Sequence, residues 1–125
     1  MNRLPKKERL HGRSIIEKLF AGGKHFRVHP FKVIWIQNQE AEDLPNLRIG
    51  ISVSKRISRK AVTRNRIKRL IREAYRTSKS PFSEKLGLAR KHIDFFLVYQ
   101  GTDEPVLLDL KEKINLILER LSKDL

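Results

Sequence analysis

The chain has 125 residues, and its 28 Lys and Arg against 14 Asp and Glu give a formal net charge of +14. This length fits one domain, and so large a positive excess favours a polyanionic partner. The absence of cysteine excludes disulfides, thiolate metal sites and a cysteine nucleophile. No apolar run reaches signal-peptide or membrane-span length, so we expect a soluble, cytoplasmic protein without a membrane partner.

The first half of the chain predicts a helix followed by a strand. Residues 12–20 carry apolar side chains at helical spacing, with Ser14 as the expected N-cap and Gly22-Gly23 as the stop. Residues 31–37 are rich in β-branched and aromatic side chains, which favours a strand. The polar residues 38–46 then predict a connecting loop.

The second half of the chain alternates strands and helices. Residues 47–53 alternate apolar and polar side chains, which predicts a half-buried strand, and residues 55–76 have the spacing of an amphipathic helix. Breakers favour a loop over residues 78–90, after which residues 92–99 read as a buried strand. A last helix is expected from Pro105 onwards. This order predicts an α/β (α+β) two-layer sandwich, formed by a single domain over residues 1–125.

Positive charge is concentrated in residues 55–76, whose only acid is Glu73. At about 100° per residue, the apolar side chains gather on one side of the helix and a polar, mostly basic stripe lies beside them. The stripe consists of Arg64, Asn65, Lys68, Arg69, Arg72 and Arg76. Solvated helical faces usually mix charge signs, whereas this stripe places like charges at i, i+4, a cost that a polyanion would remove.

Strand parity separates two faces of residues 31–37. One face carries Phe31, Val33 and Trp35, and the other carries Lys32, Ile34 and Ile36. We expect the face with Lys32 to meet a nucleic acid and Phe31 and Trp35 to belong to the core. A stacking role for Trp35 is the alternative.

Residues 49–56 (IGISVSKR) and 61–75 (AVTRNRIKRLIREAY) resemble the signature of the ribonuclease P protein family. The match centres on Arg64-Asn65-Arg66 and extends through the first helix, the Gly22-Gly23 turn and the strand that starts at Phe31. The resemblance implies a central sheet of about four strands packed by helices. It also implies a left-handed βαβ crossover, against the usual right-handed rule.

The same resemblance implies that the chain acts as the protein subunit of ribonuclease P, an endoribonuclease. In that enzyme the RNA subunit and the Mg²⁺ bound to it carry out the chemistry. The expected partners of the chain are the catalytic RNA and the 5′ leader of precursor tRNA, with no obligate protein partner. The expected RNA contacts are Lys55, Arg56, Arg64, Asn65, Arg66, Lys68, Arg69 and Arg72. The expected leader cleft holds Ile16, Phe20, Lys32 and Ile34, and family members often carry aromatic residues at the two isoleucine positions.

Catalytic or metal-binding groups of the protein itself are not predicted. His25 and His29 lack a third ligand, and the adjacent acids at 42–43 and 103–104 are typical of solvated loops. A ribosomal or other structural RNA-binding protein shares the charge and size, and only the Arg-Asn-Arg segment argues against it. A DNA-binding module lacks a helix-turn-helix or zipper pattern, and a stand-alone ribonuclease lacks candidate catalytic residues.

Overall fold

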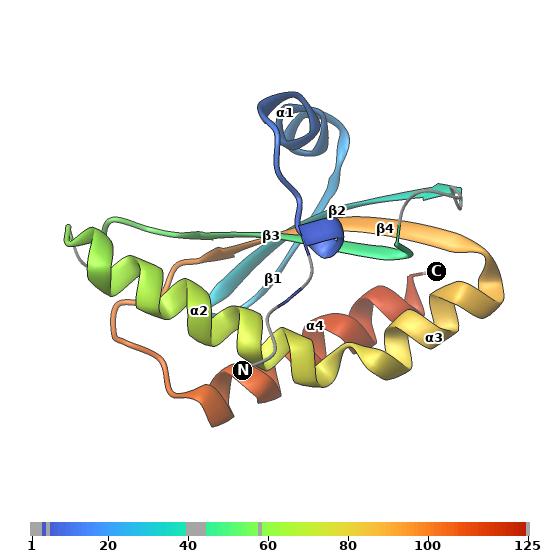
Figure 1. Cartoon of the computed structure of the whole chain (residues 1–125). Coiled ribbons are helices and arrows are strands. Elements are labelled where there is room, and N and C mark those ends of the chain that lie inside the picture. The colour runs from blue at the N-terminus through green and yellow to red at the C-terminus, as the bar shows by residue number, and fades with distance from the viewer. Residues whose placement is uncertain (1–3, 5, 40–44, 58, 125) are drawn as a thin grey trace.

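The computed structural model of the chain describes residues 4, 6–39, 45–57 and 59–124. These residues form four α-helices, four strands and one short 3-10 helix (Figure 1). In chain order they are η1 (Lys6–Glu8), α1 (Arg13–Gly22), β1 (Lys24–Val28), β2 (Phe31–Gln39), β3 (Leu47–Val53), α2 (Ala61–Ser78), α3 (Ser80–Ala89), β4 (Lys91–Tyr99) and α4 (Leu107–Lys123).

The strands form one mixed sheet in the order β1-β2-β4-β3. β1 pairs with β2 and β2 with β4 in antiparallel fashion, whereas β3 and β4 are parallel neighbours. Because α2 and α3 connect β3 to β4, these elements form the βαβ unit expected from the resemblance. The predicted α+β architecture with a four-stranded sheet is therefore confirmed.

The helices cover the two faces of the sheet unequally. α2, α3 and α4 lie on one face, and α1 stands on the other (Figure 1). The main core fills the space beneath the three helices, and it includes the fully buried Phe31, Val33, Ile71, Phe95 and Ile114. Trp35 is also buried there, so the strand parity predicted for residues 31–37 is confirmed.

A second, smaller cluster attaches α1 to the opposite face. Leu19 of α1 packs with Leu10, Ile34 and Phe96. The chain turns sharply after α1 at Gly23, whose N–H donates to the Leu19 carbonyl at 2.8 Å. A Cβ at Gly23 would lie 2.5 Å from that carbonyl oxygen, so the close approach of α1 to β2 requires glycine. The predicted stop at Gly22-Gly23 is confirmed.

Two segments differ from the sequence prediction because tertiary packing overrides local signals. The expected loop over residues 78–90 is wrong: α3 occupies most of it, with Pro81 in the first turn and Phe82 and Leu86 buried four residues apart. β1 was not predicted, because only Phe26 of its five residues is fully buried. The strand forms because it pairs with β2, although its own sequence has no clear strand pattern.

Element boundaries also move. α2 begins at Ala61, because Lys55 to Ile57 form a turn in place of the first helical turn. α1 begins at Arg13 after Gly12, so Ser14 lies within the helix and does not cap it. Asn38 and Gln39 belong to β2, and residues 40–44 of the expected loop lie outside the described residues. The last helix, expected from Pro105, begins at Leu107, and its apolar side is buried from Leu110 to Leu121. Within the described ranges, no helix has the length and apolar character needed to cross a bilayer.

Candidate nucleic-acid interface

α2 provides the basic surface and anchors it to the core. Its eighteen residues contain neither glycine nor proline, and Ile67, Ile71, Ala74 and Tyr75 are buried as the sequence predicted. The Tyr75 ring packs edge-on against Phe95, with 5.7 Å between ring centroids. Because this apolar side is fixed against the sheet, the orientation of the polar side of α2 is fixed as well.

The polar stripe of α2 keeps most of the predicted members together. Arg64, Lys68 and Arg72 are half-exposed, while Asn65 and Arg69 are exposed, and no acid lies among them on this side of the helix. Burial, together with the nearby charges of Arg9 and Arg69, lowers the pKa of the Arg72 guanidinium. Guanidinium pKa values are so high that Arg72 stays protonated, so it adds a positive charge to this side of the helix.

Two other arginines of α2 form ion pairs with glutamates. Arg76 forms a two-pronged contact with Glu73, with Nη2 at 2.6 Å from Oε1, and these hydrogen bonds lower the pKa of Glu73. Arg66 lies about 200° around the helix axis from Arg64, where it forms an exposed ion pair with Glu104. The structure therefore does not bring Arg66 together with the other predicted contacts.

Lys55 and Arg56 extend the basic surface from the end of β3. Both are exposed in the turn that leads to α2. The turn is fixed because Ser54 N–H donates to the Tyr99 carbonyl at 3.2 Å and Arg56 N–H donates to Ser54 Oγ at 3.2 Å. These two cations therefore lie in the turn before α2 and not within the helix, where the sequence had placed them.

An aromatic pair lies on the other face of the sheet from α2, which is the face that α1 occupies. Phe20 is 42% exposed, and its ring meets Phe96 edge-on with centroids 5.3 Å apart. Phe96 lies over Gly50 of the neighbouring strand, where a Cβ would lie 2.4 Å from the ring. Sequence reasoning missed Phe96, although its parity within β4, opposite to that of Phe95, was a usable signal.

The other residues predicted for the leader cleft differ in accessibility. Ile16 is half-buried beside the aromatic pair, and Lys32 is half-exposed. Lys32 is the direct cross-strand partner of Arg27, whose guanidinium donates to Gln100 Oε1 at 2.8 Å. Ile34 has no exposed surface, because α1 covers it. Ile34 therefore supports the cleft from below and is not available to touch a ligand.

A hollow of about 470 Å³ lies along β3 and is lined by residues that include Phe96 and, from α2, Arg72. The N-terminal segment forms one wall, since Leu10 N–H donates to the Ile49 carbonyl at 2.8 Å and holds this segment along β3. The lining combines cations with an apolar floor and contains no acid. The residues are Leu4, Lys6, Arg9, Leu10, His11, Ile16, Ile49, Gly50, Ile51, Arg72 and Phe96.

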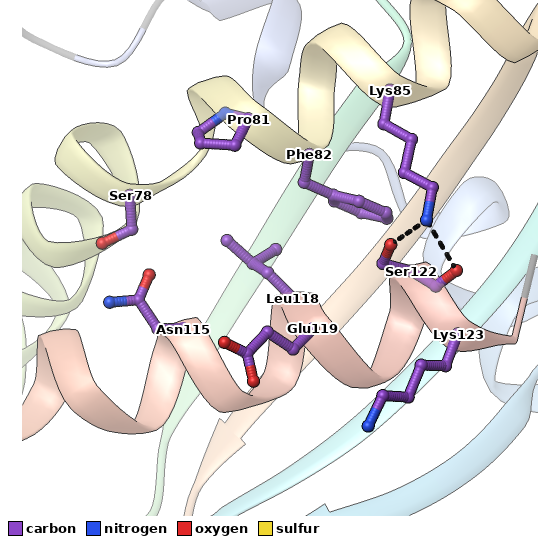
Figure 2. Close-up of a pocket in the computed structure, with 9 residues that line it drawn as sticks. All are labelled: Ser78, Pro81, Phe82, Lys85, Asn115, Leu118, Glu119, Ser122 and Lys123. Carbon is purple, nitrogen blue, oxygen red and sulfur yellow. Dashed lines mark hydrogen bonds between the residues drawn. The ribbon is translucent and has the colours of Figure 1, made fainter.

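A second hollow, of about 420 Å³, lies between α3 and α4. Phe82 and Leu118 form its apolar part, as Figure 2 shows. Lys85 does not point a free charge into it, because Nζ donates to the backbone carbonyl of Ser122 at 3.4 Å and to the Ser122 hydroxyl. Glu119 also lines this hollow, so it lacks the uniformly positive lining of the first one.

A buried charged network links β3 to β4. Arg48 donates two hydrogen bonds to Asp94, each 2.8 Å long. His92 Nε2 lies 2.6 Å from Asp94 Oδ1, and its Nδ1 lies 2.6 Å from the Pro45 carbonyl oxygen. Because both ring nitrogens face acceptors, His92 makes both hydrogen bonds only when protonated. Burial raises the pKa of Asp94, but the hydrogen bonds from His92 and Arg48 outweigh it and hold that pKa below its ordinary value.

Across the residues that the structure describes, no group of three or more His, Asp or Glu side chains is placed to hold a metal ion. The surface offers two kinds of side chain, basic groups and an exposed aromatic ring. Cations bind phosphates, and exposed aromatic rings stack on unpaired bases. These features define a small α+β protein with a basic helix and an aromatic cleft suited to a polyanionic strand.

Comparison with known proteins specifies this class further. The family model described as Ribonuclease P matches residues 4–122, so the chain belongs to the ribonuclease P protein family. The ribonuclease P protein component of Geotalea uraniireducens is 32% identical over 119 residues, which cover 95% of each protein. That of Porphyromonas gingivalis is 41% identical over 83 residues, which cover 66% of this chain but only 60% of the relative.

Solved structures of the family share the fold. The RNase P protein of Thermotoga maritima superposes with a TM-score of 0.68 at 26% identity, covering 90% of this chain and 96% of that one. The RNase P protein of Staphylococcus aureus gives a TM-score of 0.69 at 23% identity, covering 91% and 94%. The predicted family and fold are thus both confirmed.

Proposed function

We propose that this chain is the protein subunit of ribonuclease P and that it binds the catalytic RNA through α2. The observation that carries this proposal is the acid-free stripe from Arg64 to Arg72 on a helix whose other side is fixed in the core. Such a helix presents several cations in a constant geometry. This arrangement suits the phosphate backbone of a structured RNA, because phosphate contacts supply most of the affinity and the register.

The aromatic side of the surface is proposed to hold the 5′ leader of precursor tRNA. The leader is unpaired, and unpaired bases stack readily on exposed rings. Phe20 offers such a ring, and Lys32 and Arg27 offer charges on the same sheet face. Like charges directly opposite each other in a sheet are unfavourable, and a phosphate between them would remove that cost.

The division of labour follows from the groups available. The described residues contain no carboxylate cluster for two-metal hydrolysis. We therefore assign cleavage to the RNA subunit and the Mg²⁺ that it binds, and substrate affinity to the protein. Endoribonuclease activity then belongs to the complete particle, in which this chain is one subunit.

A charge-reversal pair tests the role of α2. We expect Lys68→Glu with Arg69→Glu to weaken binding of the catalytic RNA by about a hundred-fold or more, because each lost phosphate contact also forfeits counterion release. The matched control is Lys113→Glu with Lys123→Glu, which changes the charge equally on α4 and should leave the affinity nearly unchanged. Filter binding at two salt concentrations measures both. Equal loss in the two variants, or equally tight wild-type binding to ribosomal RNA, would contradict the proposal.

A further inference from the structure

Phe96 occupies a space that exists only because residue 50 has no side chain. Its register partners are Ile34 of β2 and Gly50 of β3. A Cβ at Gly50 would lie 2.4 Å from Phe96 Cδ2 and 2.5 Å from Cε2, so the ring lies directly against the backbone of β3. Gly50 belongs to an ordinary strand and has no positive φ, so other residues could adopt its backbone. The glycine is therefore needed for the ring and not for the strand.

Phe96 contacts the exposed ring of Phe20 but offers almost no surface of its own. It is 8% exposed and belongs to the small cluster that attaches α1 to the sheet, so it has little area with which to touch a ligand. Its ring meets the ring of Phe20 edge-on, with 65° between the ring planes. Such pairs have a preferred geometry, because the positive edge of one ring is attracted to the negative face of the other. The contact therefore restricts the orientation of the Phe20 ring.

We propose that Phe96 is a positioning residue of the leader cleft and that it acts only through Phe20. While the Phe96 ring fills the space over Gly50, the ring of Phe20 stays at the surface in a fixed orientation. Without the Phe96 ring, Phe20 moves down onto Gly50, because burial of its apolar surface is favourable there. An unpaired base then has no oriented ring on which to stack, and ordering one during binding costs affinity. This inference rests on the proposed function, which makes the leader the ligand.

The first test measures the leader-dependent selectivity of the reconstituted particle, defined as the dissociation constant for mature tRNA divided by that for precursor tRNA. We expect Phe96→Leu to lower this ratio by about five-fold or more, and by no more than Phe20→Ala does. Phe95→Leu is the matched control, because it is the same substitution one residue away and it removes an edge-on pair with Tyr75 on the opposite face of the sheet. Its ratio should stay within about two-fold of the wild type, although its melting temperature falls.

A double-mutant cycle shows whether Phe96 acts through Phe20. In the Phe20→Ala background, Phe96→Leu should leave the ratio unchanged, because no ring remains to be oriented. A second full loss on top of Phe20→Ala would overturn the proposal, since Phe96 would then act on the leader by another route. A lower melting temperature of Phe96→Leu with an intact ratio would overturn it as well, because Phe96 would then only pack α1 onto the sheet.

A measurement without RNA separates this inference from the proposed function. NMR spectra of the free protein record the contacts of the Phe20 ring in the wild type and in Phe96→Leu. We expect the variant to show new nuclear Overhauser contacts between the Phe20 ring and the Gly50 Hα protons, which the Phe96 ring blocks in the wild type. Unchanged contacts would overturn the positioning role. If the ring moves as expected but the wild-type particle binds both tRNAs equally, the positioning role stands and the proposed leader site fails.

Discussion

At the scale of single residues, Phe20 occupies a position that the sequence could not decide. Its spacing with Ile16 and Leu19 fits a core residue as well as a ligand contact. The structure separates these roles, because Leu19 is buried whereas Phe20 remains 42% exposed at the edge of Phe96. A ring that is held on one side and open on the other is well placed to stack on a base.

Replacing this ring gives a test of the leader cleft. We expect Phe20→Ala to weaken binding of precursor tRNA to the reconstituted particle by roughly five-fold to a hundred-fold, because stacking of a base on one ring contributes about 1–3 kcal/mol. Mature tRNA lacks the leader, so its affinity should hardly change. Dissociation constants for both RNAs, with the melting temperature of the protein, measure this. Equal loss for both RNAs and a large drop in melting temperature would assign Phe20 to packing alone.

Asp94 makes the free energy of unfolding depend on pH in the acidic range. The pKa of Asp94 is lower in the folded protein than in the unfolded chain, so its contribution is complete above the unfolded pKa. That contribution is lost as pH falls through the folded pKa. We expect Asp94→Asn to reduce the free energy of unfolding at pH 7 by about 3 kcal/mol, because Arg48 and His92 lose their buried partner.

Denaturation curves from pH 7 down to pH 2 check this prediction. The difference between the wild type and Asp94→Asn should shrink toward the acid end, because the wild-type carboxylate is then protonated. Asp109→Asn is the control, since Asp109 is exposed in the first turn of α4 and its effect should stay within about 1 kcal/mol. A difference that is constant with pH would contradict the role assigned to the carboxylate charge.

At the scale of elements, two adjacent glycines at the end of α1 have opposite requirements. A Cβ at Gly22 meets nothing within 4 Å, whereas a Cβ at Gly23 would collide with the Leu19 carbonyl and Ile34. We expect Gly22→Ala to leave the stability unchanged or raise it by up to about 1 kcal/mol, since alanine favours the helix. Gly23→Ala should cost about 1–3 kcal/mol. Melting temperatures of the two variants decide this, and equal shifts would show that α1 can move away from β2.

The elements also show what periodicity can and cannot predict. α2 and α4 were predicted because each has a long apolar stripe that depends only on its own sequence. α3 and β1 are short and half-exposed, so their own sequences do not predict them. They are stabilised because Phe82, Leu86 and Phe26 pack against distant parts of the chain in the core. The basic stripe could be predicted for the same reason as α2 and α4, because it depends only on the sequence of α2. Arg9 and Phe96 were not, because their roles arise from strand register and from how the N-terminal segment crosses β3.

At the scale of the whole molecule, the proposed function assigns binding to this chain and cleavage to the RNA subunit. We expect the purified chain, free of nucleic acid, to leave precursor tRNA intact in Mg²⁺, and cleavage at the mature 5′ end to appear when the catalytic RNA is added. Gel analysis of end-labelled substrate measures this. The Lys68→Glu and Arg69→Glu protein should restore little activity at low subunit concentration. Cleavage by protein that demonstrably lacks RNA would require a catalytic site that the described residues do not reveal.

The pairing of Arg9 with Ile49 also bears on how an outer strand of the sheet is covered. β3 is an outer strand, and an uncovered outer strand is a template for another chain to pair with. The N-terminal segment occupies part of that edge through the hydrogen bond from Leu10 to Ile49. The opposite edge, β1, carries Lys24 and Arg27, whose charges repel a second copy. Removing the segment before α1 would therefore expose β3 and favour aggregation, and it would also take Leu4 out of the main core.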